Sequence, residues 1–281
     1  MAKLNGKTAL ITGSTDGVGR MVAERLGADG WRVLVHGRDR GRGAEVIAAI
    51  KKSGGAAEFL QADLSSLAEV RRLADAVQKA TKQLDLLINN AGIGTGGPQG
   101  RRETSADGYE LRFAVNYLSG FLLTHLLLPL LKKSAPARIV NVASLGQQAI
   151  DFGDVMLQHD YSGMRAYRQS KLAQILFTIE LSPKLKGSSV TVNVLHPATF
   201  MNTAMVRQFG TPISTVEEGA DAILKLAVAP EMEGKSGLYF NGQNEAQANE
   251  QAYDAQARQK LAALSAELTG LSTRKSAAAP R

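Results

Sequence analysis

The sequence predicts a single α/β domain built on a Rossmann-like, doubly wound parallel sheet. Short apolar runs alternate with longer amphipathic stretches through about the first 200 residues, which is typical of strands joined by helices that cover both faces of a sheet. A glycine-rich turn follows the first of these runs. Because neither a linker nor an internal repeat interrupts the alternation, we expect one domain over residues 1–272 and a disordered basic tail over residues 273–281.

The expected strands are continuous apolar runs, as they are when both faces of a sheet are covered. They lie at residues 8–12, 32–36, 57–60, 84–89, 138–144 and 190–195, with a last short strand at 237–240. The expected helices have an amphipathic pattern and lie at residues 19–29, 43–52, 66–82, 108–132 and 166–184. After Pro197 the pattern predicts a loop with a short helix over 199–215, a helix over 217–227 and a helix over 244–268.

The composition excludes several classes of protein. With 44% hydrophobic and 21% charged residues, the chain suits a globular protein rather than a disordered one. The absence of cysteine excludes disulfides, thiolate metal sites and a thiol nucleophile. The four histidines have no metal-binding spacing, so we expect no metal. The net charge is +7, but the basic residues are dispersed, and we therefore expect no nucleic-acid partner.

The sequence also argues against a membrane span. The longest apolar run, residues 121–131, is interrupted by Thr124, His125 and Pro129, and it is shorter than the roughly 20 residues that cross a bilayer. The first residues lack the apolar segment of a signal peptide. We therefore expect a cytoplasmic protein.

The glycine-rich turn is the first candidate binding site. Glycines allow a sharp turn and a close approach of the backbone to a pyrophosphate, while the following helix N-terminus supplies free N–H groups. No Gly-Lys-Ser/Thr follows, which excludes a Walker loop. The context after a strand and before a helix favours a nucleotide site over a merely structural turn. The turn consists of Gly13, Ser14, Thr15, Asp16, Gly17, Val18 and Gly19.

The end of the second strand indicates which nucleotide is bound. In this fold an acidic residue there accepts hydrogen bonds from the ribose of NAD, whereas an arginine accommodates the 2′-phosphate of NADP. This chain has His36-Gly37-Arg38-Asp39-Arg40, with no carboxylate at the strand tip. The planar guanidinium of Arg38 suits a phosphate, so NADP(H) is favoured over NAD(H). The alternative is a solvated Arg38 that pairs with Asp39.

A second candidate site combines a phenol with an ammonium. Tyr167 and Lys171 are four residues apart in an expected helix and therefore share one face. A phenol is a poor base at neutral pH, but a nearby cation favours the phenolate and makes proton exchange with a substrate hydroxyl feasible. Tyr161 and Arg165 have the same spacing. We prefer the first pair because the pKa of a lysine can be tuned, whereas an arginine is always charged.

Ser144 completes the candidate reacting centre. It ends the fifth expected strand, at the sheet edge where such folds bind ligands, and its hydroxyl could hold a carbonyl oxygen beside the phenol. The structural alternatives are a strand-end cap for Ser144 and a surface pair for Tyr167 and Lys171.

Asn89-Asn90-Ala91-Gly92 follows the fourth strand. Its small residues would let a nucleoside lie against the backbone, although such a segment could also be only a turn.

Together these residues resemble the short-chain dehydrogenase/reductase family. The resemblance implies an NAD(P)-dependent oxidoreductase that interconverts an alcohol and a carbonyl, with Tyr167 as the proton donor or acceptor and Ser144 orienting the substrate oxygen. Over about residues 7–203, and in the order of the family, the matching residues are Thr12, Gly13, Gly17, Gly19, Asp63, residues 89–92, Asn116, Ser144, Tyr167 and Lys171.

The resemblance also implies further contacts. Lys171 would bind the nicotinamide ribose and lower the pKa of Tyr167, and Asn116 would hold a water molecule in a proton relay. The expected cofactor contacts are Asp63 and Leu64 with adenine, Asn90, Ala91 and Gly92 with the adenosine side, and Pro197, Thr199 and Thr203 near the nicotinamide.

Within the family the pattern is similar to that of retinol-dehydrogenase-like, NADP-dependent reductases. The long interval from Ser144 to Tyr167, the Asp151-Phe152 segment and Gly37-Arg38-Asp39 carry this likeness. One departure is Pro197-Ala198, where the family usually has Pro-Gly. Because alanine adopts positive φ less readily than glycine, we expect the following loop to take another path. The nicotinamide amide contact is therefore open between Thr199, Asn202 and Thr203.

The segments 145–165 and 199–210 are the expected walls of a substrate pocket. Their apolar residues either accept a hydrophobic ketone, aldehyde or secondary alcohol or only pack the loops. These residues are Leu145, Ile150, Phe152, Met156, Met164, Phe200, Met201, Met205 and Phe209.

The stretch 120–131 is apolar nearly all round, and the family resemblance implies a homodimer or homotetramer through this helix and the Tyr167 helix.

Other functions are also compatible with parts of the sequence. A catalytically silent NADP-binding sensor could keep the same fold, but the set of Asn116, Ser144, Tyr167 and Lys171 argues against it. A nucleic-acid binder would fit only the net charge. Sugar-nucleotide epimerisation is disfavoured because the region after Pro197 is too short for a large substrate domain.

Overall fold

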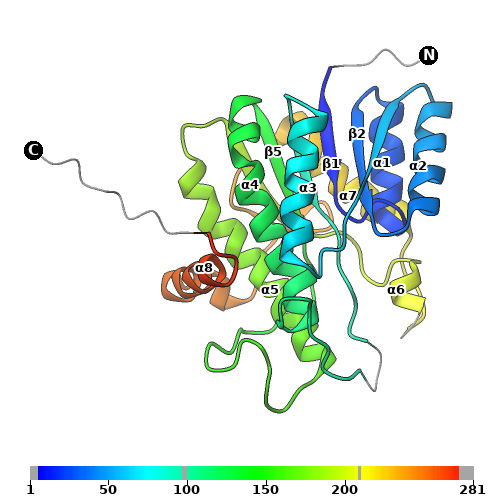
Figure 1. Ribbon diagram of the computed structural model, residues 1–281. Coiled ribbons are helices and arrows are strands. Elements are labelled where there is room, and N and C mark those ends of the chain that lie inside the picture. The colour runs from blue at the N-terminus through cyan, green and yellow to red at the C-terminus, as the bar shows by residue number, and fades with distance from the viewer. Residues whose placement is uncertain (1–5, 97–99, 208–209, 272–281) are drawn as a thin grey trace, which may run out of the picture.

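The computed structural model describes residues 6–96, 100–207 and 210–271, and it has the α/β fold that the sequence predicts (Figure 1). The order of its eight-stranded sheet within these ranges is β3-β2-β1-β4-β5-β6-β7-β8, and only β7 and β8 pair antiparallel. The order reverses between β1 and β4, which opens a ligand crevice at their carboxyl ends. The strands are β1 (Thr8–Ile11), β2 (Arg32–Gly37), β3 (Ala56–Gln61), β4 (Leu86–Asn89), β5 (Ala137–Val142), β6 (Val190–His196), β7 (Tyr239–Asn241) and β8 (Asn244–Glu245).

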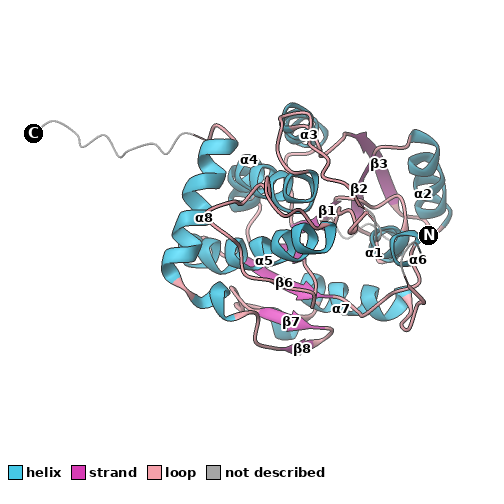
Figure 2. Ribbon diagram, turned by 90° about the horizontal axis from the view of Figure 1, so that it is seen from below, coloured by secondary structure: helices cyan, strands magenta, loops and turns pink. Residues whose placement is uncertain are grey.

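Helices cover both faces of the sheet (Figure 2). One layer contains α1 (Gly17–Ala28), α2 (Arg40–Lys52) and α7 (Val216–Val228), and the opposite layer contains α3 (Leu67–Ala80), α4 (Ser119–Lys133) and α5 (Gly163–Leu181). The short helix α6 (Ala204–Arg207) lies near the carboxyl edge of the sheet, and α8 (Ala255–Leu268) packs on the outside of α5. Shorter segments are the π-helix η1 (Phe113–Leu118) and the 3-10 helices η2 (Ser182–Leu185), η3 (Pro230–Met232) and η4 (Glu250–Tyr253).

Side-chain caps fix where helices begin. Asp39 accepts a hydrogen bond from the Arg42 N–H (3.1 Å), and α2 therefore starts at residue 40 rather than at the predicted residue 43. Thr215 and Glu218 form a reciprocal capping box at the start of α7. The helix predicted from residue 108 starts only at residue 111, because residues 104 and 110 first pair in an antiparallel bridge.

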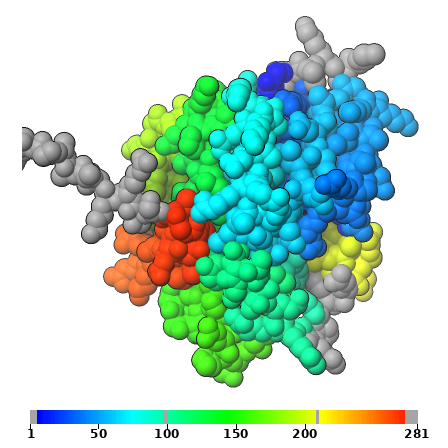
Figure 3. Space-filling view, in the orientation of Figure 1, coloured from blue at the N-terminus to red at the C-terminus, as the bar shows by residue number. Residues whose placement is uncertain are grey.

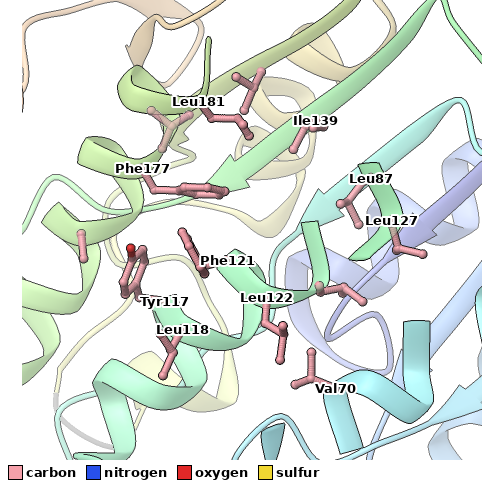
Figure 4. Close-up of a cluster of buried hydrophobic side chains, with 14 of the residues drawn as sticks. Val70, Leu87, Tyr117, Leu118, Phe121, Leu122, Leu127, Ile139, Phe177 and Leu181 are labelled. Carbon is pink, nitrogen blue, oxygen red and sulfur yellow. The ribbon is translucent and has the colours of Figure 1, made fainter. Parts of the chain in front are cut away.

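Two apolar cores lie on the two faces of the sheet. The larger one lies between the sheet and α3, α4 and α5, and aromatic rings meet at its centre (Figure 4). The ring centroids of Tyr117, Phe121 and Phe177 are 5.2 to 6.3 Å apart, a range in which tilted aromatic pairs attract one another. The second core, against α1, α2 and α7, is mainly aliphatic. Both faces of the sheet are thus covered by apolar side chains, which explains why the strands are continuous apolar runs in the sequence.

The region after β7 differs from the single helix predicted over residues 244–268. Gly242 has a φ of +60° and allows a tight turn, so residues 244–245 pair back on β7 as β8. The chain then passes through η4 and enters α8 at residue 255. The composition of this stretch favoured a helix throughout, whereas the turn chemistry of Asn241-Gly242 decides its first part.

Helix α8 is held by polar contacts as well as by apolar packing. The hydroxyl of Tyr117 bonds that of Ser265 (2.7 Å), and Arg71 of α3 donates to the carbonyl of Thr269 (2.5 Å). Figure 3 shows this end of the chain, in red, against the cyan surface of α3. α8 therefore packs on α5, one of the two helices through which a second subunit is expected.

One described helix is long and apolar enough to cross a membrane. It is the stretch Phe113–Lys133, whose mean hydropathy reaches 1.5. It extends beyond the interrupted run 121–131, because η1 and α4 are continuous. Of its apolar window, 61% is buried inside the protein, so its composition is accounted for by its place in the larger core. The predicted basic tail, 273–281, lies outside the described residues.

Candidate active site

The glycine-rich turn lies at the carboxyl end of β1 and is shaped by backbone that only glycine adopts readily. Gly13 and Gly17 have φ values of +65° and +52°. A Cβ on Gly13 would lie 2.8 Å from the Cα of Ala91, and one on Gly19 would collide with Asn90 and with the Gly13 carbonyl. The turn and the segment after β4 therefore lie too close together to leave room for a side chain on Gly13 or Gly19.

Thr12 joins these two segments. Its Oγ1 accepts hydrogen bonds from the N–H groups of Asn90 and Ala91 (both 3.0 Å), and the Asn90 amide donates back to the carbonyls of Thr12 (2.9 Å) and Gly13 (3.1 Å). In the sequence Thr12 is distinguished only as part of the family pattern. Its hydroxyl holds the segment after β4 against the glycine-rich turn. The position of Thr12 directly before the first glycine is the sequence signal from which this role could have been predicted.

Ser14 ties the glycine-rich turn to β1 and β2. Its side chain is fully buried, donates to the Ile11 carbonyl (2.7 Å) and accepts from the His36 N–H (2.9 Å). The hydroxyl therefore points into the sheet rather than toward a cofactor, and Ser14 does not line the cavity. The Ser14 N–H also donates to the His36 carbonyl (2.9 Å), and a contact between Ser14 and a cofactor stays a prediction.

His36 supports the same turn. Its Nδ1 accepts a hydrogen bond from the Gly13 N–H (3.1 Å). Burial lowers the pKa of His36 to about 4, so the ring stays neutral at physiological pH and Nδ1 remains an acceptor. Sequence reasoning missed this residue, because a lone histidine at a strand end carries no distinctive spacing.

A cluster of arginines lies where β2 ends. Arg38 is 71% exposed, and its guanidinium is 3.9 Å from the Asp63 carboxylate. Arg42 bonds Asp16 (3.2 Å), and Arg40 bonds Gln61 (2.6 Å). Residues 38–42 and Thr15 line a shallow hollow beside the main cavity. Asp39, the first carboxylate after β2, is used as the cap of α2 and does not pair with Arg38.

A cavity of about 810 Å³ joins the two candidate sites. It runs along the carboxyl edge of the sheet, where the order of the strands reverses. Of the predicted site residues, those that line it are Gly13, Thr15, Asp16, Gly17, Val18, Gly19, Arg38, Asp63, Leu64, Asn90, Ala91, Gly92, Ser144, Tyr167, Lys171, Pro197, Thr199 and Thr203.

Tyr167, Lys171 and Ser144 come together in this cavity. Tyr167 bonds the Ser144 side chain, whose Oγ also accepts from the Gly146 N–H (3.1 Å). Burial raises the pKa of Tyr167, and the bond with Ser144 only partly opposes this effect. The phenol therefore holds its proton at neutral pH and is prepared to donate it.

Lys171 lies beneath the phenol. Its Nζ is 5.8 Å from the centre of the Tyr167 ring and donates to the Val142 carbonyl (3.0 Å) and to Gln174 (3.1 Å). Burial lowers the pKa of Lys171 to about 7. The prediction that a charged Lys171 favours the phenolate therefore needs correction above that pH, where its ammonium loses its proton.

Asn116 lies one layer behind the cavity wall. Its amide accepts from the Ile93 N–H (2.7 Å) and donates to the Ile93 carbonyl (3.1 Å) and the Ser170 hydroxyl (3.0 Å). It belongs to η1, and single π-helical turns of this kind are common at functional sites. In the described structure Asn116 positions the chain after Gly92 and does not itself line the cavity.

The loop after β6 has its left-handed backbone conformation two residues after Ala198. The left-handed residue is Phe200, with a φ of +47°, which is strained for a bulky side chain. Thr199 bonds His196 (3.0 Å), and Thr203 lies over Gly17, where a Cβ would be 3.3 Å from its methyl carbon. Both threonines line the cavity, whereas Asn202 bonds Arg207 (2.8 Å) and does not.

The competing pair, Tyr161 and Arg165, has a structural role. Tyr161 donates to Glu110 (3.1 Å) and accepts from the buried Arg112 (3.0 Å). Arg165 pairs with Asp151 (2.9 Å). The four-residue spacing alone therefore does not identify the reacting pair. Tyr161 lies before α5, whereas Tyr167 and Lys171 both lie in α5 and line the cavity.

The expected wall residues divide into two groups. Those that line the cavity are Leu145, Met164, Phe200, Met201 and Met205. Ile150, Phe152 and Met156 pack against the larger core instead, and Phe209 lies outside the described residues. The cavity therefore has an apolar wall, built from fewer residues than expected.

The shape of the cleft fits a dinucleotide. Bare glycine backbone lines it, and a Cβ on Gly92 would lie 3.3 Å from Asn116 Oδ1 and 3.5 Å from Lys171 Nζ. A side chain there would take up space in front of the lysine. The free N–H groups at the start of α1 suit a pyrophosphate. The fold and these side chains define a dinucleotide-dependent oxidoreductase.

Comparisons with known proteins agree with this class. A family model of the short chain dehydrogenases matches residues 7–213. Retinol dehydrogenase 14 of Homo sapiens is 38% identical over 95% of this chain and 88% of its own length. A crystal structure from Mycobacterium paratuberculosis has a TM-score of 0.78 at 29% identity and covers 96% of both chains. RhlG of Pseudomonas aeruginosa, in an NADP active-site complex, has a TM-score of 0.68 at 29% identity and covers 85% of this chain and 95% of its own.

The chain belongs to the short chain dehydrogenase family. It is an NAD(P)-dependent oxidoreductase that acts between CH–OH and C=O groups.

Proposed function

We propose that this protein is an NADP(H)-dependent reductase of hydrophobic aldehydes and ketones, in which Tyr167 donates the proton. The observation that carries the proposal is the convergence of Tyr167, Ser144 and Lys171 in a cavity that also contains the glycine-rich turn. The raised pKa of Tyr167 favours reduction, because a protonated phenol is the form that a carbonyl oxygen needs as it gains charge.

In the proposed mechanism the residues of the chain bind, orient and protonate the carbonyl. The Ser144 hydroxyl holds the carbonyl oxygen, and the Tyr167 hydroxyl gives that oxygen its proton. Bound NADPH would supply the hydride to the carbonyl carbon. Lys171 would hold the nicotinamide ribose and, when protonated, limit the charge that the phenolate must carry. Asn116 keeps the segment after Gly92 in place.

The preference for NADP(H) follows from the arginines after β2. Arg38, Arg40 and Arg42 surround the hollow in which a 2′-phosphate would lie, and Asp39 is occupied as a helix cap. A phosphate there would gain charge-assisted bonds, whereas a ribose hydroxyl would find no free carboxylate at the strand tip. We further propose that Pro197, Thr199 and Thr203 contact the nicotinamide end, and Asp63, Leu64, Asn90 and Ala91 the adenosine end.

The test combines purified protein with NADPH or NADH and a panel of apolar aldehydes, ketones and quinones, followed by nicotinamide absorbance. We expect NADPH oxidation, lost by at least about 100-fold in Tyr167→Phe and unchanged in Tyr253→Phe, whose hydroxyl caps the exposed backbone at Ala248. Tight NADPH binding without turnover of any carbonyl would contradict the reductase and favour a sensor.

The cofactor preference has its own measurement. Arg38→Gln is expected to raise the Kd for NADPH by about 10-fold or more and to leave that for NADH unchanged. Arg32→Gln is the control, because this arginine pairs with Glu58 (2.9 Å) at the start of β2. Equal effects of Arg38→Gln on the two cofactors would contradict a 2′-phosphate contact.

We also propose a homo-oligomer and a cytoplasmic location. A second subunit would pack beside α8 on the outer face of α4, where Leu126 and Leu130 are only partly buried. Most of the apolar window of Phe113–Lys133 is buried inside the protein, and this burial supports the proposed cytoplasmic location. A molar mass of one chain at every concentration in light scattering would overturn the oligomer, and recovery of the expressed protein in the membrane fraction would overturn the location.

A further inference from the structure

Arg168 is the residue of the cavity wall that the proposed mechanism leaves without a task. It follows Tyr167 in α5, and its stem lies against Gly146, where a Cβ would be 3.8 Å from the arginine Cγ and 3.5 Å from Ser144 Oγ. It lines the cavity and is exposed. The guanidinium is therefore carried by the same helix and loop that hold the reacting centre.

Its charge is not compensated by the protein. Within residues 6–96, 100–207 and 210–271 the Arg168 guanidinium has neither a hydrogen-bond nor an ion-pair partner, and the remaining ranges contain no Asp or Glu. Three other arginines differ: Arg165 bonds Asp151 (2.9 Å), Arg102 donates to the Met156 carbonyl (3.0 Å), and Arg112 lies buried with Glu110.

The surroundings of Arg168 at this end of the cavity are apolar. Leu145 and Met164 lie on the same segments and are 52% and 43% exposed. The other cation here, Lys171, is buried and bonded to Val142 and Gln174. The acidic residues of the cavity lining, Asp16 and Asp63, lie at the glycine-rich turn and after β3.

We propose that Arg168 binds a carboxylate on the substrate, so that the preferred substrates are apolar oxo-acids. This inference rests on the proposed function and names the substrate class of the same cavity. A guanidinium forms two parallel bonds with a carboxylate, and these bonds are strongest beside apolar surface. A phosphate dianion would need further donors, as in the cluster of Arg38, Arg40 and Arg42.

The test measures kcat/KM with NADPH for a series of straight-chain oxo-carboxylic acids and their methyl esters, in which the number of methylenes between the carbonyl and the acid varies. At one chain length the acid should be preferred over its ester by about 10- to 100-fold. Arg168→Gln should reduce this ratio to about 1, and Arg168→Lys should restore part of it, because an ammonium keeps the charge but not the two parallel bonds. Arg165→Gln, the matched control, should keep the wild-type ratio.

A binding measurement separates this inference from the proposed function. Dodecanoate, which cannot be reduced, should bind the NADPH complex in calorimetry, with an affinity about 10-fold lower in Arg168→Gln than in Arg165→Gln. Turnover of the esters with no preference for the acids at any length would overturn the carboxylate site and leave the reductase standing. No turnover, with dodecanoate binding that depends on Arg168, would overturn the reductase and keep the anion site. No turnover and no such dependence would overturn both.

Discussion

Lys171 should lower the stability of the fold by an amount that depends on pH. Its side chain is 5% exposed, and burial lowers the pKa of its ammonium from 10.5 to about 7. Because this pKa is lower in the folded chain, the unfolded chain binds more protons between these two values. The free energy of unfolding therefore falls as the pH decreases from about 10.5 to about 7, and this contribution is constant below that range.

The magnitude follows from the two pKa values. Each pKa unit corresponds to about 1.4 kcal/mol, so the full effect is at most about 5 kcal/mol, of which about 3 kcal/mol accumulates between pH 9.5 and pH 7.0. Lys171→Met removes the ammonium and keeps most of the apolar stem. It also removes the bonds to Val142 and Gln174, which adds an offset that is the same at each pH. Relative to wild type, the variant should gain about 3 kcal/mol of stability as the pH falls from 9.5 to 7.0.

The assay is urea unfolding followed by circular dichroism at several pH values between 7.0 and 9.5. Both proteins share every other titrating group, so the difference between their unfolding free energies isolates Lys171. Lys184→Met is the matched control, because it removes a lysine side chain that is 57% exposed. A difference for Lys171→Met that stays constant within about 0.5 kcal/mol would refute the reasoning, since it would mean that burial does not destabilise the ammonium.

Three further outcomes are expected. Because burial raises the pKa of Tyr167, alcohol oxidation, which needs the phenolate, should rise with pH, while carbonyl reduction should lose, as the pH rises through about 7, only the part that the Lys171 ammonium contributes; an oxidation rate that does not change with pH would contradict this. Tyr117→Phe removes a buried 2.7 Å bond to Ser265 and should lower the free energy of unfolding by about 1 kcal/mol, measured by urea unfolding, with little change in the Kd for NADPH. Gly13→Ala, at a φ of +65° and with Ala91 2.8 Å away, should abolish NADPH binding in a fluorescence titration, and an unchanged Kd would show that the turn can open.

Much of the site could be predicted from the sequence because its residues occupy special places along the chain. Gly13 and Gly17 lie at the first junction of a strand and a helix, where a positive φ is needed. Ser144 follows a strand end, and Tyr167 and Lys171 share one face of a helix. Each of these positions follows from period, spacing and the topology of a parallel sheet.

The remaining features depend on which way a side chain points, and residue type does not determine this. Ser14 turns into the sheet because the Ile11 carbonyl and the His36 N–H are within reach. Ile150, expected in a pocket wall, packs in the core. The spacing of Tyr167 and Lys171 predicts a charged lysine beside the phenol, but it does not show how deeply the lysine is buried. The whole fold removes the Lys171 ammonium from water, and this burial lowers its pKa.

The position of α8 has a consequence for the order in which the protein can mature. The glycine-rich turn, Ser144, Tyr167 and Lys171 all precede residue 172, whereas the helix that closes the aromatic core ends at residue 268. A nascent chain emerges N-terminal end first, so its site residues leave the ribosome well before Ser265 can reach Tyr117. During that interval the outer side of α5 lacks the α8 residues that cover it in the folded chain.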